Sequence, residues 1–180
     1  MNPRLLVTRN SLLVTLSLME LPHTAGCLVC GRQNPHGLKL SLHVDESTGV
    51  VSVSFTPRPE HIGFEGIVHG GVLATVLDEA MVWAATWAGK RFCVAGEMTV
   101  RFRQSAAVGG ALRVETRVDS NRSRLIQTSG TIIDSAGALV AEASGKYVPV
   151  PSERHRHVLT TLVNEPSTAD AATLLKEGSR

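Results

Sequence analysis

Hydrophobic and polar residues alternate with a period of two along most of this chain. Apolar side chains alternate with polar ones over residues 38–44 and again over 51–55, which predicts two half-buried strands joined as a hairpin. Four more alternating segments follow at 98–103, 112–119 and, in the last third of the chain, 125–133 and 139–148. Turn residues separate these four segments, so three successive hairpin connections predict an antiparallel meander.

One long segment does not alternate. Residues 71–88 read GVLATVLDEAMVWAATWA, in which Asp78 and Glu79 are the only ionisable residues. A segment that is apolar on nearly every face predicts a buried helix over roughly 70–88, with Gly89 closing it at the C-cap. Because a sheet with one apolar face must cover that face, the predicted fold class is α+β, an antiparallel sheet wrapped around one long central helix.

The two acids in the middle of this helix are the first candidates for chemistry. A carboxylate among apolar side chains costs free energy unless it is paired, hydrogen-bonded or protonated. Titratable groups with such perturbed surroundings concentrate at functional sites. Asp78 and Glu79 are adjacent, so their side chains point about 100° apart around the helix, and they cannot occupy the same position in a site.

Size and charge narrow the possible functions. The 180 residues suffice for about one domain with tails. The formal net charge is +2 and aromatic residues make up only 4% of the chain, which argues against a nucleic-acid partner. The apolar run at 71–88 is long enough to cross a bilayer, but two acids at its centre argue against stable membrane insertion.

Composition divides the chain into three parts. Residues 27–150 hold all the predicted strands and the helix and form the predicted domain. Residues 1–26 begin with a stretch that has two arginines and no acid, which we interpret as a disordered or weakly helical extension, with a targeting segment as the alternative. Residues 151–180 are polar, and we expect a tail with marginal helix there.

The three cysteines indicate a reducing compartment, and we predict a cytoplasmic protein. Cys27 and Cys30 have C-x-x-C spacing, and His23 and His36 flank them. A structural zinc site needs four ligands, and no second such pair follows nearby. Zinc binding therefore stays open as an alternative, but plain thiols are the favoured interpretation, and we predict no metal and no cofactor.

Two segments carry a resemblance to a known family. Residues 66–81 read GIVHGGVLATVLDEAM, and residues 27–38 read CLVCGRQNPHGL. Together they resemble the PaaI-like acyl-CoA thioesterases of the hotdog fold superfamily. The resemblance implies that the backbone N–H of Gly70 polarises a thioester carbonyl and that Asp78 acts as general base or nucleophile. It also implies homodimers, which often pair into tetramers.

Spacing supports the dimer on physical grounds. A helix N-terminus offers unpaired N–H donors and the positive end of a dipole, as an oxyanion requires. Gly70 and Asp78 are eight residues apart, which is roughly 12 Å along a helix axis. A base and an oxyanion donor for one carbonyl must both lie about 3 Å from the reacting atoms. We therefore expect Gly70 of one subunit to face Asp78 of its partner.

The remaining site candidates have weaker support. His69 could contact substrate or serve only the local structure, and Glu79 could replace Asp78 as the base or orient the site. Gly71 could let substrate approach the helix or simply allow close packing. Basic residues would bind the phosphates of CoA, and Trp83, which we interpret first as core, could line an acyl pocket. The substrate-binding candidates are Gly71, Arg101, Arg103, Arg122, Arg124 and Trp83.

Two positions depart from the family pattern. Some relatives carry an asparagine and a serine or threonine where this chain has Gly63 and Ala95. Neither can position a water through its side chain, although His61 or Thr99 could substitute. We expect acyl-CoA hydrolysis to a carboxylic acid and free CoA. The alternatives are a non-catalytic acyl-CoA-binding hotdog protein and an enoyl-thioester hydratase or dehydratase.

Overall fold

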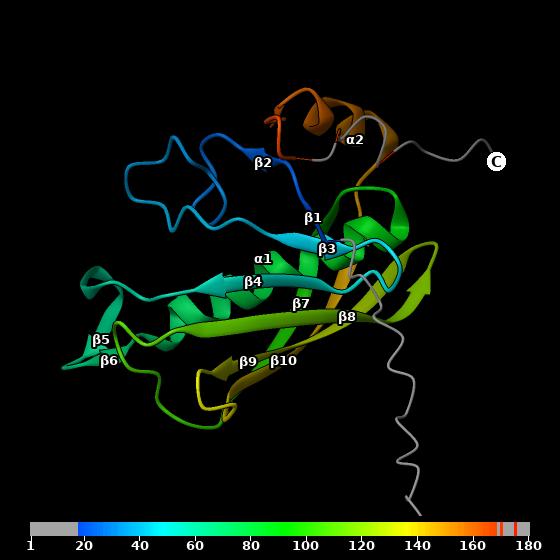
Figure 1. The fold of residues 1–180 in the computed structure, drawn as a ribbon. Coiled ribbons are helices and arrows are strands. Elements are labelled where there is room, and N and C mark those ends of the chain that lie inside the picture. The colour runs from blue at the N-terminus through cyan, green and yellow to red at the C-terminus, as the bar shows by residue number, and fades with distance from the viewer. Residues whose placement is uncertain (1–17, 169, 171–174, 176–180) are drawn as a thin grey trace, which may run out of the picture.

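The computed structural model describes residues 18–168, 170 and 175, and within them the chain forms one curved antiparallel sheet around a long helix (Figure 1). The sheet has seven strands in the order β1-β3-β4-β8-β9-β10-β7. This arrangement confirms the predicted fold class. The strands are β1 (Leu18–Glu20), β3 (His43–Asp45), β4 (Val51–Phe55), β7 (Cys93–Phe102), β8 (Leu112–Arg122), β9 (Leu125–Asp134) and β10 (Leu139–Pro149).

Helix α1 (Gly70–Gly89) fills the inner face of the sheet. Its apolar side chains are buried on almost every side, as the sequence predicts, because alternate residues of β4, β8, β9 and β10 point towards it. A polar contact also fixes the helix to the sheet, since the Thr116 hydroxyl of β8 donates to the Ala80 carbonyl at 3.0 Å. The core therefore lies between α1 and the sheet, and the outer face of the sheet carries the polar alternates.

The predicted four-strand meander is wrong in one connection. β7 pairs with β10 instead of β8, and β8 lies between β4 and β9. The connection between β7 and β8 is held against the loop that precedes α1, where Val68 N donates to Ala106 O at 2.9 Å and Val108 N to Gly66 O at 3.0 Å. These bonds hold the β7–β8 connection beside the start of α1. One edge of β7 therefore stays unpaired within the described sheet.

β7 contains one extra residue, Gly96. Ala95 pairs with Tyr147 and Glu97 pairs with the adjacent Lys146, so Gly96 has no counterpart on β10. This bulge changes the alternation of inner and outer faces along the strand. As a result Cys93 is buried, while its neighbour Val94 is 54% exposed.

Two further sequence predictions need correction. The strand expected over 38–44 shrinks to β3, because Lys39 has a left-handed backbone (φ 56°) and Leu38 N donates to Leu28 O at 2.8 Å. Gly89 is the last residue of α1 rather than its cap, and Lys90 takes the left-handed C-cap conformation (φ 52°). Gly89 is needed for packing instead, since a Cβ there would lie 2.6 Å from Ile126 Cδ1 of β9.

Short elements surround this core. They are η1 (Pro59–His61), the hairpin β5 (Ile62–Phe64) and β6 (Ile67–Val68), the pair β2 (His23–Thr24) and β11 (Leu162–Val163), and α2 (Ser152–Leu159). His155 of α2 is buried and accepts from Phe92 N at 3.2 Å through Nδ1, while its Nε2 lies 3.2 Å from the Leu175 carbonyl. The start of the predicted extension, residues 1–17, lies outside the described residues. Within the described part, no helix has the length and hydropathy that crossing a membrane requires.

Candidate active site

The start of α1 leaves one backbone donor available. His69 is the N-cap residue, and its Nδ1 accepts the N–H of Gly71 at 2.9 Å. Its carbonyl accepts the N–H of Val72 at 2.9 Å. Among the described residues the N–H of Gly70 has no acceptor, because the first turn of a helix has none to offer. His69 therefore serves the local structure, and Gly70 presents a free N–H at the positive end of the helix dipole.

A largely apolar cavity of about 540 Å³ opens beside this N–H. Phe102, at the end of β7, covers Gly70 so closely that a Cβ at Gly70 would lie 3.2 Å from Phe102 Cζ. Phe64 is 79% exposed at the same cavity, and Phe102 is 53% exposed. Sequence reasoning did not single out either phenylalanine. Lining residues also include Gly63, Ile67, His69, Leu73, Arg103 and Gln104.

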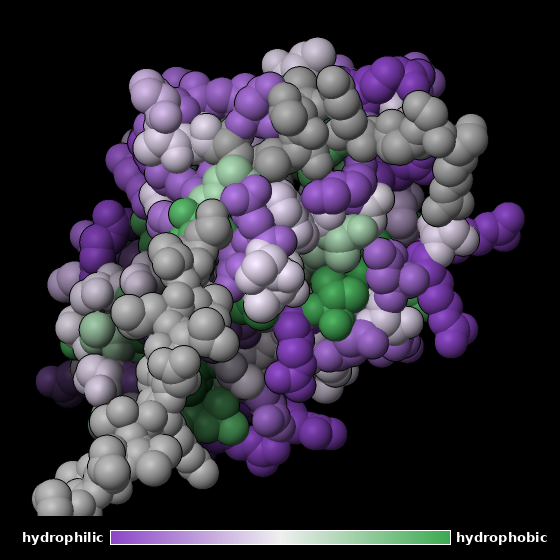
Figure 2. All heavy atoms as spheres, turned by 45° about the vertical axis from the view of Figure 1, so that its right-hand side comes forward, coloured by the Kyte–Doolittle hydropathy of each residue, from purple (hydrophilic) through white to green (hydrophobic). Residues whose placement is uncertain are grey.

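Several exposed apolar side chains gather at this cavity. Figure 2 shows one face of the molecule, on which hydrophilic residues predominate and hydrophobic groups are visible only as patches between them. Phe64, Phe102 and Ile67 are all at least 36% exposed around one free backbone donor. A mainly apolar lining beside a free backbone N–H suits a ligand that has an apolar part and a polarisable carbonyl.

Asp78 lies further along α1 and is half-buried. The buried phenol of Tyr147, on β10, donates to Asp78 Oδ1 at 3.0 Å. Burial, and then the nearby Asp78, raise the pKa of Tyr147, so the phenol keeps its proton and orients the carboxylate. Sequence reasoning missed Tyr147. The available signal was that the only tyrosine of the chain occupies an inward position of a strand that faces α1.

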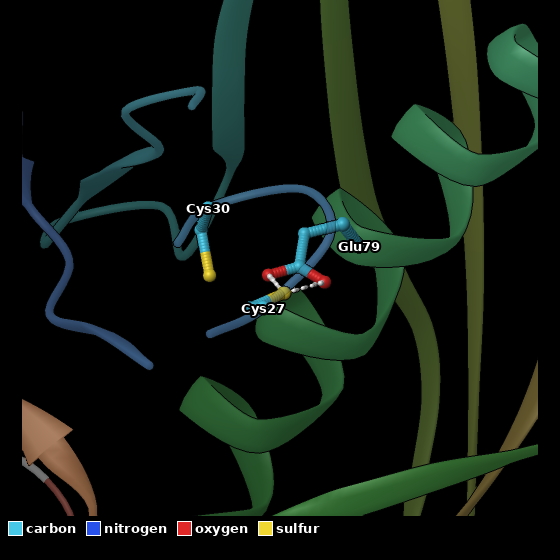
Figure 3. Close-up of side chains that lie close together, drawn as sticks. All are labelled: Cys27, Cys30 and Glu79. Atoms are coloured by element: carbon cyan, nitrogen blue, oxygen red, sulfur yellow. Dashed lines mark hydrogen bonds between the residues drawn. The ribbon is translucent and has the colours of Figure 1, made fainter. Parts of the chain in front are cut away.

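Glu79 points to a different set of neighbours (Figure 3). Its carboxylate oxygens each lie 3.8 Å from Cys27 Sγ, and Oε1 accepts the indole N–H of Trp83 at 3.3 Å. Burial, and then the negative charge of Cys27, raise the pKa of Glu79 to about 7. Trp83 is buried and packs edge-on against Phe92, so it belongs to the core around Glu79 and does not line the cavity at Gly70.

The ionisation of Cys27 and the ionisation of Glu79 are coupled. A hydrogen bond from the Cys30 thiol is the largest cause that lowers the pKa of Cys27, to about 5, with backbone N–H groups adding to it against burial. The same bond keeps the proton on Cys30 and raises its pKa. A Cys27 thiolate beside a protonated Glu79, and a Cys27 thiol that donates to a Glu79 carboxylate, differ only in the place of one proton.

The two residues considered as substitutes for the family's water-positioning side chains lie elsewhere. His61 is buried, its Nδ1 accepts from Arg58 N at 3.0 Å, and its ring packs against Phe55. Burial, and then the charge of Arg58, lower the pKa of His61. Thr99 lines a separate cavity of about 450 Å³ on the outer face of the sheet. Neither residue lines the cavity at Gly70.

The four arginine candidates separate into three places. Arg103 lines the cavity at Gly70 and forms an ion pair with Glu142. Arg101 lies 4.0 Å from the same Glu142 but lines the outer-face cavity. Arg122 and Arg124 are exposed at the β8–β9 turn, which lies at the opposite end of α1, where Asn121 Nδ2 donates to Ala88 O at 3.0 Å. Within one subunit, only Arg103 is therefore close to Gly70.

Comparison with known proteins agrees with this fold. Residues 65–146 match the family model of the thioesterase superfamily. No curated protein matches the chain.

Several solved structures share the fold. One thioesterase superfamily protein is 25% identical with a TM-score of 0.63, over 68% of this chain and 60% of that one, so this chain spans less than two thirds of it. The PaaI protein of E. coli, from the phenylacetic acid degradation operon, is 21% identical with a TM-score of 0.59, over 63% of this chain and 81% of that one. A Streptococcus mutans protein bound to acetyl CoA is 18% identical with a TM-score of 0.55, over 57% of this chain and 82% of that one.

The antiparallel sheet around one long helix is a hotdog fold, as in these solved structures. The resemblance predicted from the sequence is confirmed, because residues 65–146 match the thioesterase superfamily model and the PaaI protein of E. coli has a similar fold.

Proposed function

We propose that this protein hydrolyses an acyl-CoA thioester to a carboxylic acid and free CoA. The observation that carries the proposal is the N–H of Gly70, which has no acceptor within the described residues and opens on an apolar cavity of about 540 Å³. That volume lies within the range of small-molecule sites. The carbonyl oxygen of the thioester would accept this N–H, and the acyl group would lie against Phe64 and Phe102. The relative that binds acetyl CoA supports the choice of ligand.

The catalytic acid would come from a second subunit. Asp78 does not line the cavity at Gly70. It is joined through Tyr147 to Ala95, near one end of β7, whereas Gly70 lies under Phe102 at the other end of that strand. If two β7 edges pair antiparallel about a twofold axis near the middle of the strand, the Ala95 end of one subunit meets the Phe102 end of its partner. The unpaired edge of β7 and the exposed side chain of Val94 support this dimer.

The proposed reaction is general-base hydrolysis. Asp78 takes a proton from water, and the water oxygen forms a bond to the thioester carbon. The negative charge that develops on the carbonyl oxygen is stabilised by the N–H of Gly70 in the partner subunit and by the helix dipole. When the tetrahedral intermediate collapses, the C–S bond breaks, and the CoA sulfur leaves and takes up the proton. No metal takes part in this scheme.

The test is thiol release from a panel of acyl-CoA substrates that spans short, long and aromatic acyl groups. Replacing Asp78→Asn should lower kcat by about 10²–10⁴-fold, which is the usual contribution of a general base. Asp119→Asn is the control, because Asp119 lies on the exposed part of β8, where it accepts a hydrogen bond from the Ser129 hydroxyl. Near-normal turnover in Asp78→Asn would show that another group activates the water.

Non-catalytic binding of an acyl-CoA is the second candidate, and one packing detail favours it. A Cβ at Gly63 would lie 2.9 Å from the Cα of His69, so this backbone has no room for the asparagine that some relatives carry. Saturable binding of acyl-CoA without thiol release would support this candidate. Addition of water to a crotonyl-CoA-like substrate would instead support a hydratase.

A further inference from the structure

A second cluster of reactive side chains lies against α1 and includes Glu79, the neighbour of the proposed catalytic acid, whose side chain points away from Asp78. Cys27, Cys30 and Glu79 each offer one ligating atom, and these atoms all lie within 4.8 Å of one another. The two sulfurs come from one tight loop and the carboxylate from α1, as Figure 3 shows. Sequence reasoning considered His23 and His36 as the partners of the cysteine pair, but neither belongs to this cluster.

The distances fit a tetrahedral metal site. A Zn²⁺ ion with Zn–S of about 2.3 Å and Zn–O of about 2.0 Å holds its sulfur and oxygen ligands about 3.5 Å apart. Cys27 Sγ lies 3.8 Å from each oxygen of Glu79, so a shift of a few tenths of an ångström would be enough. Cys30 is only 4% exposed and closes the site on the protein side, whereas Cys27 is partly exposed and leaves a path for an ion.

Hydrogen bonds to the ligands hold them in place. Val29 N donates to Cys27 Sγ at 3.3 Å, and the indole N–H of Trp83 donates to the Glu79 carboxylate. Such contacts orient the ligands of metal sites. The loop is also too tight for a side chain at Gly31, since a Cβ there would lie closer than 3.0 Å to backbone atoms of Cys27 and Ala25.

We propose that Cys27, Cys30 and Glu79 bind one divalent transition-metal ion, best matched by Zn²⁺, with a fourth coordination position open to water. Two thiolates select zinc over magnesium or calcium, which prefer oxygen ligands. Binding would replace the protons of the thiols and of the carboxyl group, and these protons would be released to solvent. The ion would join the loop of residues 25–31 to α1.

This proposal does not depend on the thioesterase activity. The ligands exclude Asp78, and the reaction proposed for Asp78 needs no metal. Asp78→Asn should therefore bind Zn²⁺ like the wild type, even if it loses turnover, so the two proposals can fail separately.

The test uses the full chain, reduced and stripped of metal with a chelator. Titration with ZnCl₂ against a chromophoric competitor should give one ion per chain. CoCl₂ should give thiolate-to-cobalt charge-transfer bands and the intense visible bands of tetrahedral cobalt. Cys27→Ser and Cys30→Ser should weaken zinc binding by more than about 100-fold, since even loss of an outer contact costs about 10–100-fold.

Two further variants refine the test. Glu79→Gln should weaken zinc binding by at least about 10-fold but keep the charge-transfer bands, because both sulfurs remain. Cys93→Ser is the matched control, since Cys93 is a buried cysteine outside the cluster, and its zinc affinity should equal that of the wild type. Circular dichroism shows which variants are folded. If Cys30→Ser does not fold, the more exposed Cys27→Ser decides the question.

Three results would overturn the proposal. The first is the absence of zinc binding and of cobalt charge-transfer bands in the reduced wild-type chain. The second is undiminished zinc affinity in a folded Cys27→Ser variant. The third is a Cys27–Cys30 disulfide in the isolated protein whose reduction does not create a zinc site, which would assign the pair to redox chemistry.

Discussion

Replacing Glu79 with glutamine should change how the stability of the metal-free protein depends on pH. An unfolded glutamate loses its proton near 4.5, whereas burial raises the pKa of Glu79 in the folded protein to about 7. Between these values the folded state binds more protons than the unfolded state. The stabilising contribution of Glu79 is therefore fully present below the unfolded value and is lost as the pH rises through the folded value.

The size of the effect follows from the two pKa values. A rise from 4.5 to about 7 corresponds to about 3 kcal/mol of lost stability when both states are ionised. About 2.5 kcal/mol of this should be lost between about pH 5 and about pH 8. Glu79→Gln removes the titration, so the difference in unfolding free energy between wild type and variant should change by this amount across the same range.

Urea unfolding at a series of pH values, with chelator and reductant present, measures the effect. The pKa of Cys27 is lowered, so the contribution of Cys27 to stability grows with pH over the same range in which that of Glu79 is lost. The quantity to compare is therefore the difference in unfolding free energy between wild type and variant at each pH. The same comparison in a Cys27→Ser background should keep its sign, because burial is the largest cause of the shift at Glu79. Glu60→Gln, at a side chain that is 73% exposed, controls for the loss of a negative charge. If the free energy of unfolding changed with pH in parallel for wild type and Glu79→Gln, the raised pKa of the buried Glu79 carboxyl would be refuted.

Other substitutions test other parts of the structure. Tyr147→Phe removes the bond to Asp78, so chemical denaturation should show a loss of about 1–3 kcal/mol, and an unchanged free energy of unfolding would mean that the bond contributes nothing. Val94→Asp places a charge at the unpaired edge of β7 and should convert a dimer to monomers in light scattering, and a dimer that persists would place the interface elsewhere. Gly31→Ala should lower the free energy of unfolding by more than about 2 kcal/mol, because backbone atoms surround the new Cβ. Gly26→Ala, where a Cβ meets nothing within 4 Å, should have little effect on the melting temperature, and equal losses would contradict the packing argument.

The elements of this fold could be predicted from the sequence, but their arrangement could not be predicted completely. Alternation shows which face of a strand is buried, and this located β4, β8, β9 and β10 correctly. It does not show which strands are neighbours, so the pairing of β7 with β10 was missed. That pairing depends on hydrogen bonds between the β7–β8 connection and the loop before α1, which leave no pattern in the hydrophobicity of either segment.

The candidate site shows the same limit. The carboxylates on α1 and the glycine at its start were found because their residue types are unusual for a buried helix. The partners of the carboxylates were not found, because Tyr147 is 69 residues from Asp78, and Cys27 is 52 residues from Glu79. The C-x-x-C spacing gave a reason to consider zinc, but only the folded chain brings a third ligand to the two sulfurs.

The extra glycine in β7 affects the unpaired edge of the sheet and the contact between this strand and α2, two features that involve residues far apart in the sequence. Gly96 is the extra residue, so deleting it would leave Ala95 opposite Tyr147 and Glu97 opposite Lys146. Cys93 would still face the core, and Val94 would still face outwards. The deletion would instead remove the bend and added twist that the bulge gives β7, and would move Phe92, whose N–H donates to His155 Nδ1 of α2. A single deletion at this point would therefore keep the core side chains in place, but it would change the direction of the unpaired edge of the sheet and the contact of β7 with the C-terminal helix.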